Sequence, residues 1–277
     1  MATLESLSSL VSRSVVSADT NEIPTRYLLL ESVRAYCRSR DPDPVATRLA
    51  HALWVRGLAD RCVAAMRTRQ TGPFLRGLAR ELPNIRAGVA HDLDLDPHAA
   101  MHMLAGFGLF LTRVVHNTEA LHWVRAVSRA APDAPVADRA RVAINLVALN
   151  DFAGNFDEAR RLVAQAVDTV FAELTEEHDP LDRGELHYFL GYSAVETRHV
   201  DIALDQAQKA IEVGTQSGIR WVAGAGRVVH AVARALQALL DGDFDALAEA
   251  AREATGSHAA GRTRSSPRST CAIPTGR

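Results

Sequence analysis

The sequence repeats one short motif three times: Gly154-Asn-Phe-Asp-Glu-Ala159, Arg198-His-Val-Asp-Ile-Ala203 and Gly242-Asp-Phe-Asp-Ala-Leu247. Successive copies start 44 residues apart, since 198 − 154 = 44 and 242 − 198 = 44. A stretch with helical spacing of apolar residues precedes each copy, and another follows it. Internal periods of about 20–50 residues are typical of stacked helical hairpins. The motif therefore predicts repeated helix–turn–helix units.

The residue types within the motif suit a turn between two helices. Glycine or a polar residue ends the first helix, the apolar third residue fills the bend, and an aspartate such as Asp157 or Asp201 caps the second helix. Small residues follow at a spacing of two turns, Ala159 with Ala166 and Ala203 with Ala210. We expect these alanines to lie on one helix face, where a small side chain lets a neighbouring helix approach closely.

Composition agrees with helix packing. Apolar residues make up 47% of the 277 residues, which is enough for a sizeable core, but aromatic residues make up only 5%. A core built from Ala, Leu and Val suits closely packed helices better than a β-sandwich. The predicted fold is all-α: an α-solenoid of tetratricopeptide-like hairpins, preceded by a partial winged-helix segment with a small β-hairpin.

The first forty residues differ from the rest. Apolar residues at helical spacing from Leu4 to Val11 predict a helix, and the β-prone runs 14–17 and 27–30 predict two short strands around a polar turn. A second helix follows from Leu30 to Arg40 and ends before two prolines. This order of helix, hairpin and helix is typical of the end of a winged-helix domain.

Four regions follow from these patterns. They are a partial winged-helix segment (1–42), linking helices with a first solenoid hairpin (43–131), tetratricopeptide-like repeats (132–254) and a disordered tail (255–277). The linking helices are expected at 45–70, 74–80, 83–95, 99–114 and 118–131, with a break at Gly72-Pro73. The tail is rich in Gly, Ser, Thr and Arg and has too few apolar residues to fold.

Several stretches resemble one family. Leu7–Val16 and Arg26–Tyr36 are similar to the junction that follows the nucleotide-binding module of bacterial STAND-type ATPase transcriptional regulators of the LuxR and antibiotic-regulator kind. Glu81–Val89 resembles their linking helices, and Trp123 lies where their first solenoid hairpin often has tryptophan. In this family a winged helix and a tetratricopeptide-like solenoid follow the ATPase core.

The resemblance implies the sensor arm of such a regulator without its other modules. The family binds ATP through a glycine-rich loop ending in a lysine, whereas the single lysine here, Lys209, follows no glycine loop. We therefore expect no cofactor, and a fragment or short relative that lacks the ATPase and DNA-reading modules.

Charge and cysteine usage limit the partners and the compartment. The net charge of −2 provides no overall field for nucleic acid, so we expect none to bind this chain alone. Cys37, Cys62 and Cys271 are far apart and indicate reduced thiols. The longest apolar run, Met103–Leu111, is much shorter than the roughly 20 residues that cross a bilayer. A cytoplasmic protein without membrane contact is the expectation.

No catalytic constellation stands out, and we predict no catalytic, metal or cofactor residue. His98 and His102 have the spacing of a two-histidine metal face, but no acid lies between them and no third ligand is evident. One alternative function is nevertheless a metal-dependent hydrolase that uses this pair. Another is a weak DNA-binding remnant, because Arg26 and Arg34 lie in the winged-helix segment.

A binding surface is the better hypothesis. Solenoids bind partners along the groove that their first helices form. Tyr188 and Tyr192 stand one turn apart in the middle repeat, and Arg141 and Phe152 in the preceding repeat would face the same groove. The alternative is that both tyrosines belong to the core between repeats. The predicted function is a non-catalytic scaffold for a protein or peptide partner, such as a subunit of a regulator, or for another ligand.

Overall fold

The computed structural model describes residues 4–20, 25–66, 68, 71–250 and 252. Most of them are helical, and the fold is all-α with one small two-stranded antiparallel sheet. Contacts divide the chain into an N-terminal unit, Met1–Leu53, and a C-terminal unit, Trp54–Arg277. The predicted tail, 255–277, lies outside the described residues.

The N-terminal unit has the predicted order of elements. Helix α1 (Leu4–Ser12) precedes strands β1 (Val16–Asp19) and β2 (Arg26–Leu29), which pair with Val16 opposite Leu29, and α2 (Glu31–Arg40) follows. Within the described part of this unit, Val16 and Ala52 are the buried apolar side chains. Most of its leucines and both of its tyrosines are exposed. The unit thus has little core of its own.

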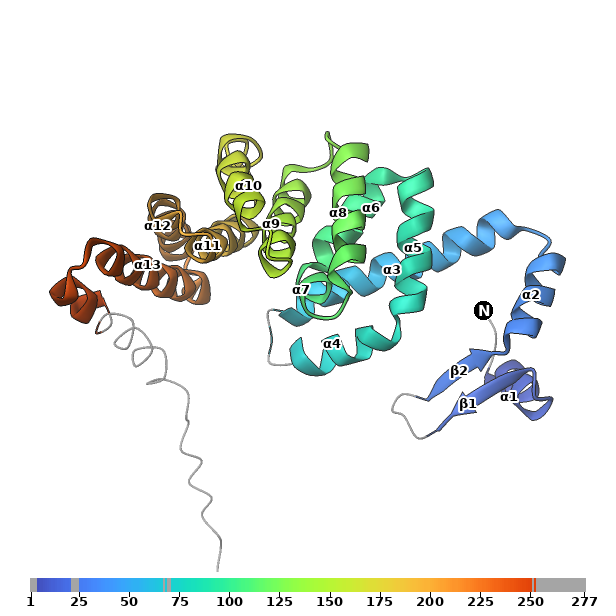
Figure 1. The fold of residues 1–277 in the computed structure, drawn as a ribbon. Helices are drawn as coiled ribbons and strands as arrows, with labels where there is room; N and C mark the ends of the chain where they lie inside the picture. Colours follow the sequence, from blue (N-terminus) through green and yellow to red (C-terminus); the bar gives the residue numbers. More distant parts are fainter. Residues whose placement is uncertain (1–3, 21–24, 67, 69–70, 251, 253–277) are drawn as a thin grey trace, which may run out of the picture. The chain divides into compact units, whose positions relative to one another are not determined.

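The C-terminal unit consists of helices joined mostly by short turns, with a longer connection, residues 169–179, between α10 and α11 (Figure 1). It begins within α3 (Pro44–Met66) and continues through α4 (Thr71–Arg80), α5 (Leu82–Leu95), α6 (Pro97–Gly106), α7 (Gly108–Arg113), α8 (Asn117–Ala130), α9 (Val136–Phe152), α10 (Phe156–Asp168), α11 (Pro180–Glu196), α12 (Val200–Gln216) and α13 (Arg220–Asp241). Residues 244–250 are helical too.

Two apolar clusters hold this unit together. One surrounds the tilted ring pair Phe107–Phe110 and joins α3 to α9. The other joins α9 to α13 through Leu186, Leu190 and a set of alanines. The motif alanines Ala159, Ala166, Ala203 and Ala210 are all buried, as their spacing predicted.

All three motif copies lie at connections between helices. Gly154, Arg198 and Gly242 each have a left-handed backbone, with φ of 77°, 60° and 70°. In each copy the next amide donates to a carbonyl five positions earlier: Asn155 to Asn150 at 2.9 Å, His199 to Ala194 at 2.8 Å and Asp243 to Ala238 at 2.8 Å. This bond, with a left-handed residue, is the Schellman ending of a helix. The sequence repeat is therefore a repeat of backbone geometry.

The capping aspartate is predicted two positions too late in the motif. Helices α10 and α12 begin after Asn155 and His199, neither of which caps through its side chain, and Asp157 and Asp201 lie inside the first turn. At this position the carboxylate is stabilised by the positive end of the helix dipole, but it does not cap the helix. In the third copy an aspartate does cap the following turn, but it is Asp243 and not the equivalent Asp245: Asp243 Oδ1 accepts hydrogen bonds from the amides of Asp245 and Ala246.

Two predicted helix boundaries also need correction. Gly72-Pro73 does not break a helix but lies in the first turn of α4, where proline is tolerated. The helix expected at 99–114 is divided into α6 and α7 at Phe107. A Cβ on Gly106 would lie 3.0 Å from the Ala59 carbonyl oxygen, and one on Gly108 would lie 2.8 Å from Asn145 Oδ1. The two glycines on either side of Phe107 therefore pack closely against residues that are distant in the sequence, at the point where α6 ends and α7 begins.

The repeated turn yields a stability prediction. Arg198 adopts the left-handed conformation that the two other copies assign to glycine, and this conformation costs a residue with a Cβ about 1 kcal/mol. We expect Arg198→Gly to raise the free energy of unfolding by about 0.5–1 kcal/mol in urea denaturation. Arg198→Ala, which removes the charge but keeps the Cβ, should give no such gain. Equal effects of both substitutions would contradict the role of backbone strain.

Candidate functional site

A pocket of about 610 Å³ lies within the C-terminal unit. Helices α6 and α7 form one side of it, and α9 and α11 form the other walls. Its surface is mainly apolar, with a smaller number of charged and hydroxyl groups. Sites for small ligands usually measure about 300–1,000 Å³ and have this composition. The pocket therefore has the size and chemistry of a binding site.

The 44-residue repeat explains why α9 and α11 present similar faces to the pocket. Five lining residues of α9 each have an equivalent on α11 whose number is larger by 44. The pairs are Arg141 and Glu185, Ile144 and Tyr188, Asn145 and Phe189, Ala148 and Tyr192, and Phe152 and Glu196. Within each set the positions are separated by 3, 1, 3 and 4 residues, so each set lies on one face of its helix. The pocket is thus formed by the same face of two successive first helices.

All four residues predicted for the groove line this pocket: Arg141, Phe152, Tyr188 and Tyr192. Tyr192 is 48% exposed and Phe152 is 54% exposed, so neither ring belongs to the core. Tyr188 is half-buried, and its ring lies 4.9 Å from that of Phe189, measured between centroids. The aromatic residues therefore form an accessible wall.

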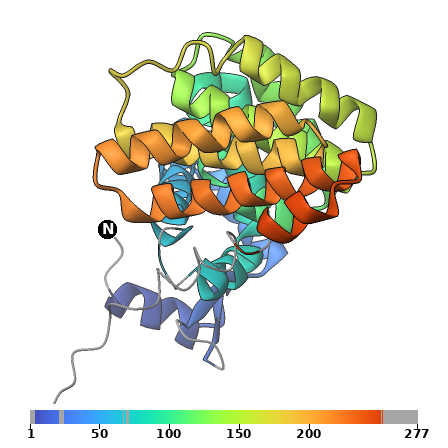
Figure 2. The same cartoon turned by 90° about the vertical axis from the view of Figure 1, so that its left-hand side faces the viewer.

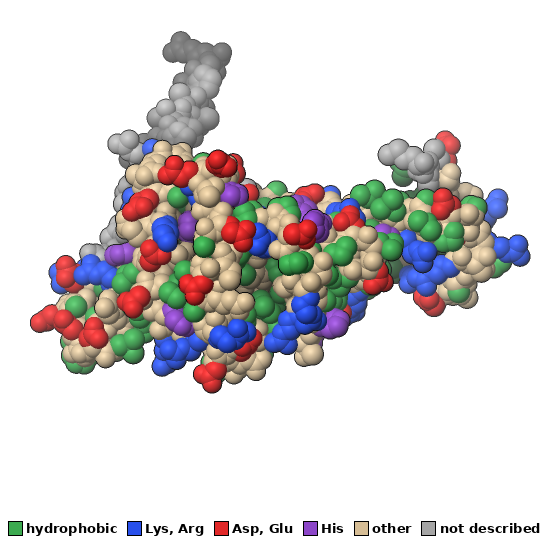
Figure 3. Space-filling view, turned by 90° about the horizontal axis from the view of Figure 1, so that it is seen from above, with side chains coloured by type: hydrophobic (Ala, Val, Ile, Leu, Met, Phe, Trp, Pro, Cys, Tyr) green, Lys and Arg blue, Asp and Glu red, His purple; other side chains and the backbone are tan. Residues whose placement is uncertain are grey.

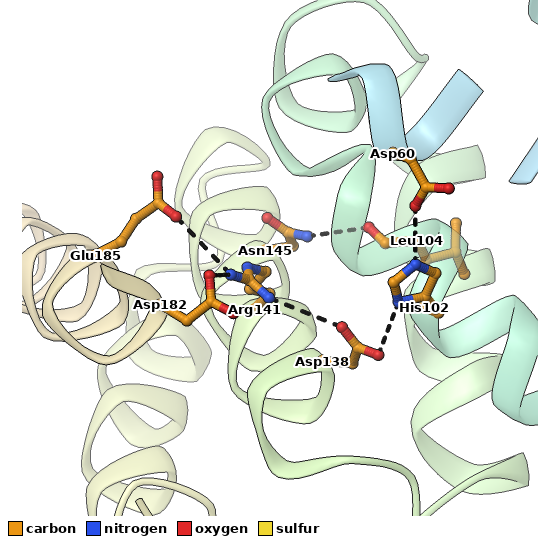
Figure 4. Close-up of polar contacts among 8 residues, drawn as sticks. All are labelled: Asp60, His102, Leu104, Asp138, Arg141, Asn145, Asp182 and Glu185. Carbon is orange, nitrogen blue, oxygen red and sulfur yellow. Dashed lines mark hydrogen bonds and ion pairs between the residues drawn. The ribbon is translucent and has the colours of Figure 1, made fainter. Parts of the chain in front are cut away.

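Arg141 has a different role from the one expected. Its guanidinium lies 2.6 Å from Asp182 and 3.8 Å from both Glu185 and Asp138, and only 18% of its side chain is exposed (Figure 4). Three carboxylates thus surround one positive charge. Arg141 lines the pocket, but it links α9 to α11 and does not present a free charge to a partner.

The exposed positive charge at the pocket comes from Arg113, a residue outside the predicted groove set. This residue ends α7, and its guanidinium lies 5.5 Å from the centre of the Phe152 ring, within the range of a cation–π contact. Its sequence position carries no signal, because only folding brings α7 to the end of α9. Arg113 holds the Phe152 ring at the edge of the pocket.

Burial changes the pKa values of acidic and phenolic side chains that line the pocket. Burial raises the pKa of Asp151 and of Tyr188. The pKa of Tyr192 is raised too, first by burial and then by the neighbouring Glu196 carboxylate. The pocket thus has neutral phenols next to carboxylates.

The sequence also carries a signal for two of these carboxylates. Glu185 and Glu196 follow from the 44-residue period when 44 is added to the numbers of Arg141 and Phe152.

A polar network extends from the pocket to α3 (Figure 4). His102 on α6 contacts Asp138 of α9 through Nδ1 and Asp60 of α3 through Nε2, each at 3.0 Å. Both carboxylates accept, so both ring nitrogens must donate, which requires the imidazolium form. In agreement, the hydrogen bond with Asp138, followed by that with Asp60, raises the pKa of His102 to about 9. His102 is a cation that joins three helices.

This arrangement bears on the predicted histidine pair. His102 uses both nitrogens for carboxylates, and His98 contacts Asp133 at 3.0 Å through Nε2. Among the described residues, no group of three His, Cys, Asp or Glu side chains could hold a metal ion. The geometry gives the metal-dependent hydrolase no support.

Acidic and basic side chains are interspersed on the face of the C-terminal unit that Figure 3 shows.

No described helix is long and apolar enough to cross a membrane. Comparison with protein-family models, with curated proteins and with solved structures finds no match for this chain.

The imidazolium bridge predicts a pH dependence of stability. The pKa of His102 is about 9 in the folded chain against an ordinary 6.5, so the bridge contributes fully below pH 6.5 and is lost as the pH rises through 9. Because half of the side chain is exposed, the loss should be at most about 1 kcal/mol. We expect urea denaturation of the native chain to show this fall between pH 6.5 and about 10.

The variant His102→Asn lacks the imidazolium bridge, so its free energy of unfolding should not show the decrease that deprotonation of His102 causes. The difference between the two proteins separates His102 from Cys62, whose pKa burial raises to about 11 and which titrates in the same range. Identical pH profiles for the native chain and the variant would show that the bridge does not contribute.

Proposed function

We propose that this chain is a non-catalytic binding scaffold that takes up a segment of a protein or peptide partner in the pocket between α9 and α11. The observation that carries the proposal is an accessible aromatic lining, formed by Phe152 of α9 and by Tyr188 and Tyr192 of α11, around a cavity of about 610 Å³. Aromatic residues provide a large contact area and dominate the energetics of many interfaces. The proposed partner inserts an apolar side chain between these rings.

A tetratricopeptide-like solenoid is the proposed architecture. Its support is the identical turn geometry in the three motif copies and the contact of each first helix with the next, α9 with α11 and α11 with α13. Such solenoids bind partners along the groove of their first helices. The pocket lies along these helices.

The charges of the pocket suggest how a partner would be oriented. Arg113 lies at the Phe152 end, together with Glu196 of α11, and Glu185 lies near Arg141 at the other end. Charged and polar groups across an interface contribute to specificity and association rate more than to affinity. We therefore propose an apolar side chain as the anchor, with polar flanks that fix its direction.

The cellular context is proposed from the sequence resemblance. The order helix, hairpin, helix in the N-terminal unit and the small number of buried side chains there support a partial winged-helix segment. On this basis we propose a cytoplasmic relative of the STAND-type regulators whose partner is a protein, such as a regulator subunit. Pairing of Arg141 and His102 with carboxylates supports structural roles for these residues and not catalytic ones.

A peptide selection tests the pocket. Random peptides displayed on phage would be selected on the full chain, and the affinity of a synthetic copy would be measured by fluorescence polarisation. We expect the double substitution Tyr188→Ala/Tyr192→Ala to weaken binding at least about tenfold, because removal of central aromatic residues typically costs more than about 1 kcal/mol each.

Phe156→Ala is the matched control, since Phe156 is an exposed aromatic residue that does not line the pocket. This control should bind the peptide as the native chain does. Equal affinity of the native chain and the double variant for every selected peptide would disprove the proposed site, as would a failure to select any peptide.

A further inference from the structure

Helix α13 carries an apolar stripe on a face that is separate from its packed face. The packed face includes Val222, which lies against α11, and Ala223, which lies against α12. On the other face, Trp221 is 43% exposed, Val232 is 43% exposed and Leu239 is 59% exposed. Figure 2 shows α12 and α13, in orange and red, at the front of the C-terminal unit.

The stripe has the spacing of a helix-pairing seam. Its members are separated by 4, 3, 4, 3 and 4 residues: Trp221, Ala225, Val228, Val232, Ala235 and Leu239. Alternating steps of three and four keep apolar residues on one side of a helix over several turns and are typical of coiled coils. Every member is apolar and none is charged, so one side of the 22-residue helix could pack against another helix along most of its length.

The earlier repeats show that this part of a first helix accepts a neighbouring helix. Val228 and Ala235 are equivalent to Gly184 and Gly191 of α11, since 228 − 44 = 184 and 235 − 44 = 191. Both glycines are buried, next to Val222 and Val229 of α13 respectively. On α13 the equivalent Val228 and Ala235 are only partly buried, and larger exposed residues flank them. The positions of Gly184 and Gly191 are thus covered on α11, whereas their equivalents on α13 are partly accessible.

We propose that α13 pairs with α13 of a second copy of this chain, antiparallel and about a twofold axis at the level of residue 230. In this register the numbers of paired residues add up to 460, which places Trp221 opposite Leu239, Ala225 opposite Ala235, and Val228 opposite Val232. Large residues meet large ones, small meet small and medium-sized meet medium-sized. A twofold interface requires a surface that matches itself in this way.

Self-matching is what favours a second copy over a different protein. A stripe that serves an unrelated helix has no reason to be symmetric in side-chain size about its own centre. Specific dimers usually bury about 800 Å² per partner, and a 22-residue helix about 33 Å long offers less than this from its seam alone. The dimer should therefore depend on concentration. The seam is distinct from the proposed peptide pocket, which contains no residue of α13.

Sedimentation of the full chain tests this pairing between about 1 µM and 1 mM. The native chain should dimerise within this range. Trp221→Lys and Leu239→Glu, each alone, should remain monomeric, because a charge would lie in the apolar seam. Leu95→Glu, which alters a 70% exposed leucine at the end of α5, is the control and should dimerise normally.

The two single variants also test the register. In an equimolar mixture, the lysine introduced at position 221 of one chain would face the glutamate introduced at position 239 of the other. The native Leu239 of the first chain would still pack against the native Trp221 of the second, so a heterodimer should form. The double variant Trp221→Lys/Leu239→Glu should form a homodimer through two such charge pairs. A parallel pairing would place like charges together in the double variant and would not restore the dimer.

Three results would overturn the proposal. A native chain that is monomeric at every concentration would assign the seam to a helix of another protein. Dimers that persist in both single variants would place the interface elsewhere. Single variants that are monomeric but do not associate when mixed would exclude the antiparallel register, and circular dichroism of each variant would confirm that its helices are intact.

Discussion

The arrangement of the C-terminal unit depends on how closely its helices approach one another. A Cβ on Gly214 of α12 would lie 2.4 Å from the Ala223 nitrogen of α13, and one on Gly184 of α11 would lie 2.6 Å from Val222 Cγ1. With Ala159 and Ala203 fully buried as well, backbones and not long side chains define the spacing of the helices. Small residues on one face of a first helix leave the larger residues of its other face to line the groove.

Local sequence predicted much of this arrangement because the repeat is a local signal. Gly154 and Gly242 mark left-handed helix ends, and the position of Arg198 follows from the 44-residue period although arginine itself does not indicate such a conformation. The hairpin of the N-terminal unit was predicted from two short β-prone runs and a polar turn. These features depend on residues that are neighbours along the chain.

What the sequence could not reveal depends on residues that are far apart. The division of α6 from α7 at Phe107 accompanies packing against Ala59 and Asn145, so the apolar pattern alone suggested one helix. His98 and His102 have metal-site spacing, but Asp133, Asp138 and Asp60 determine what they contact. Likewise, the four groove residues were predicted from helix faces, whereas the neutralisation of Arg141 by Asp182 needs the next repeat.

The chemistry of the groove face changes along the chain although its geometry repeats. On α9 this face carries Ile144 and Ala148, and the equivalent positions of α11 are Tyr188 and Tyr192. The next equivalents, 188 + 44 = 232 and 192 + 44 = 236, are Val232 and Leu236 of α13. At these positions aliphatic side chains on α9 are thus followed by aromatic ones on α11 and by aliphatic ones on α13. Other lining positions also take part in helix packing: Arg141 pairs with Asp182 of α11 and Asn145 donates to the Leu104 carbonyl of α6, so substitutions there would alter the contacts between helices as well as the lining of the pocket.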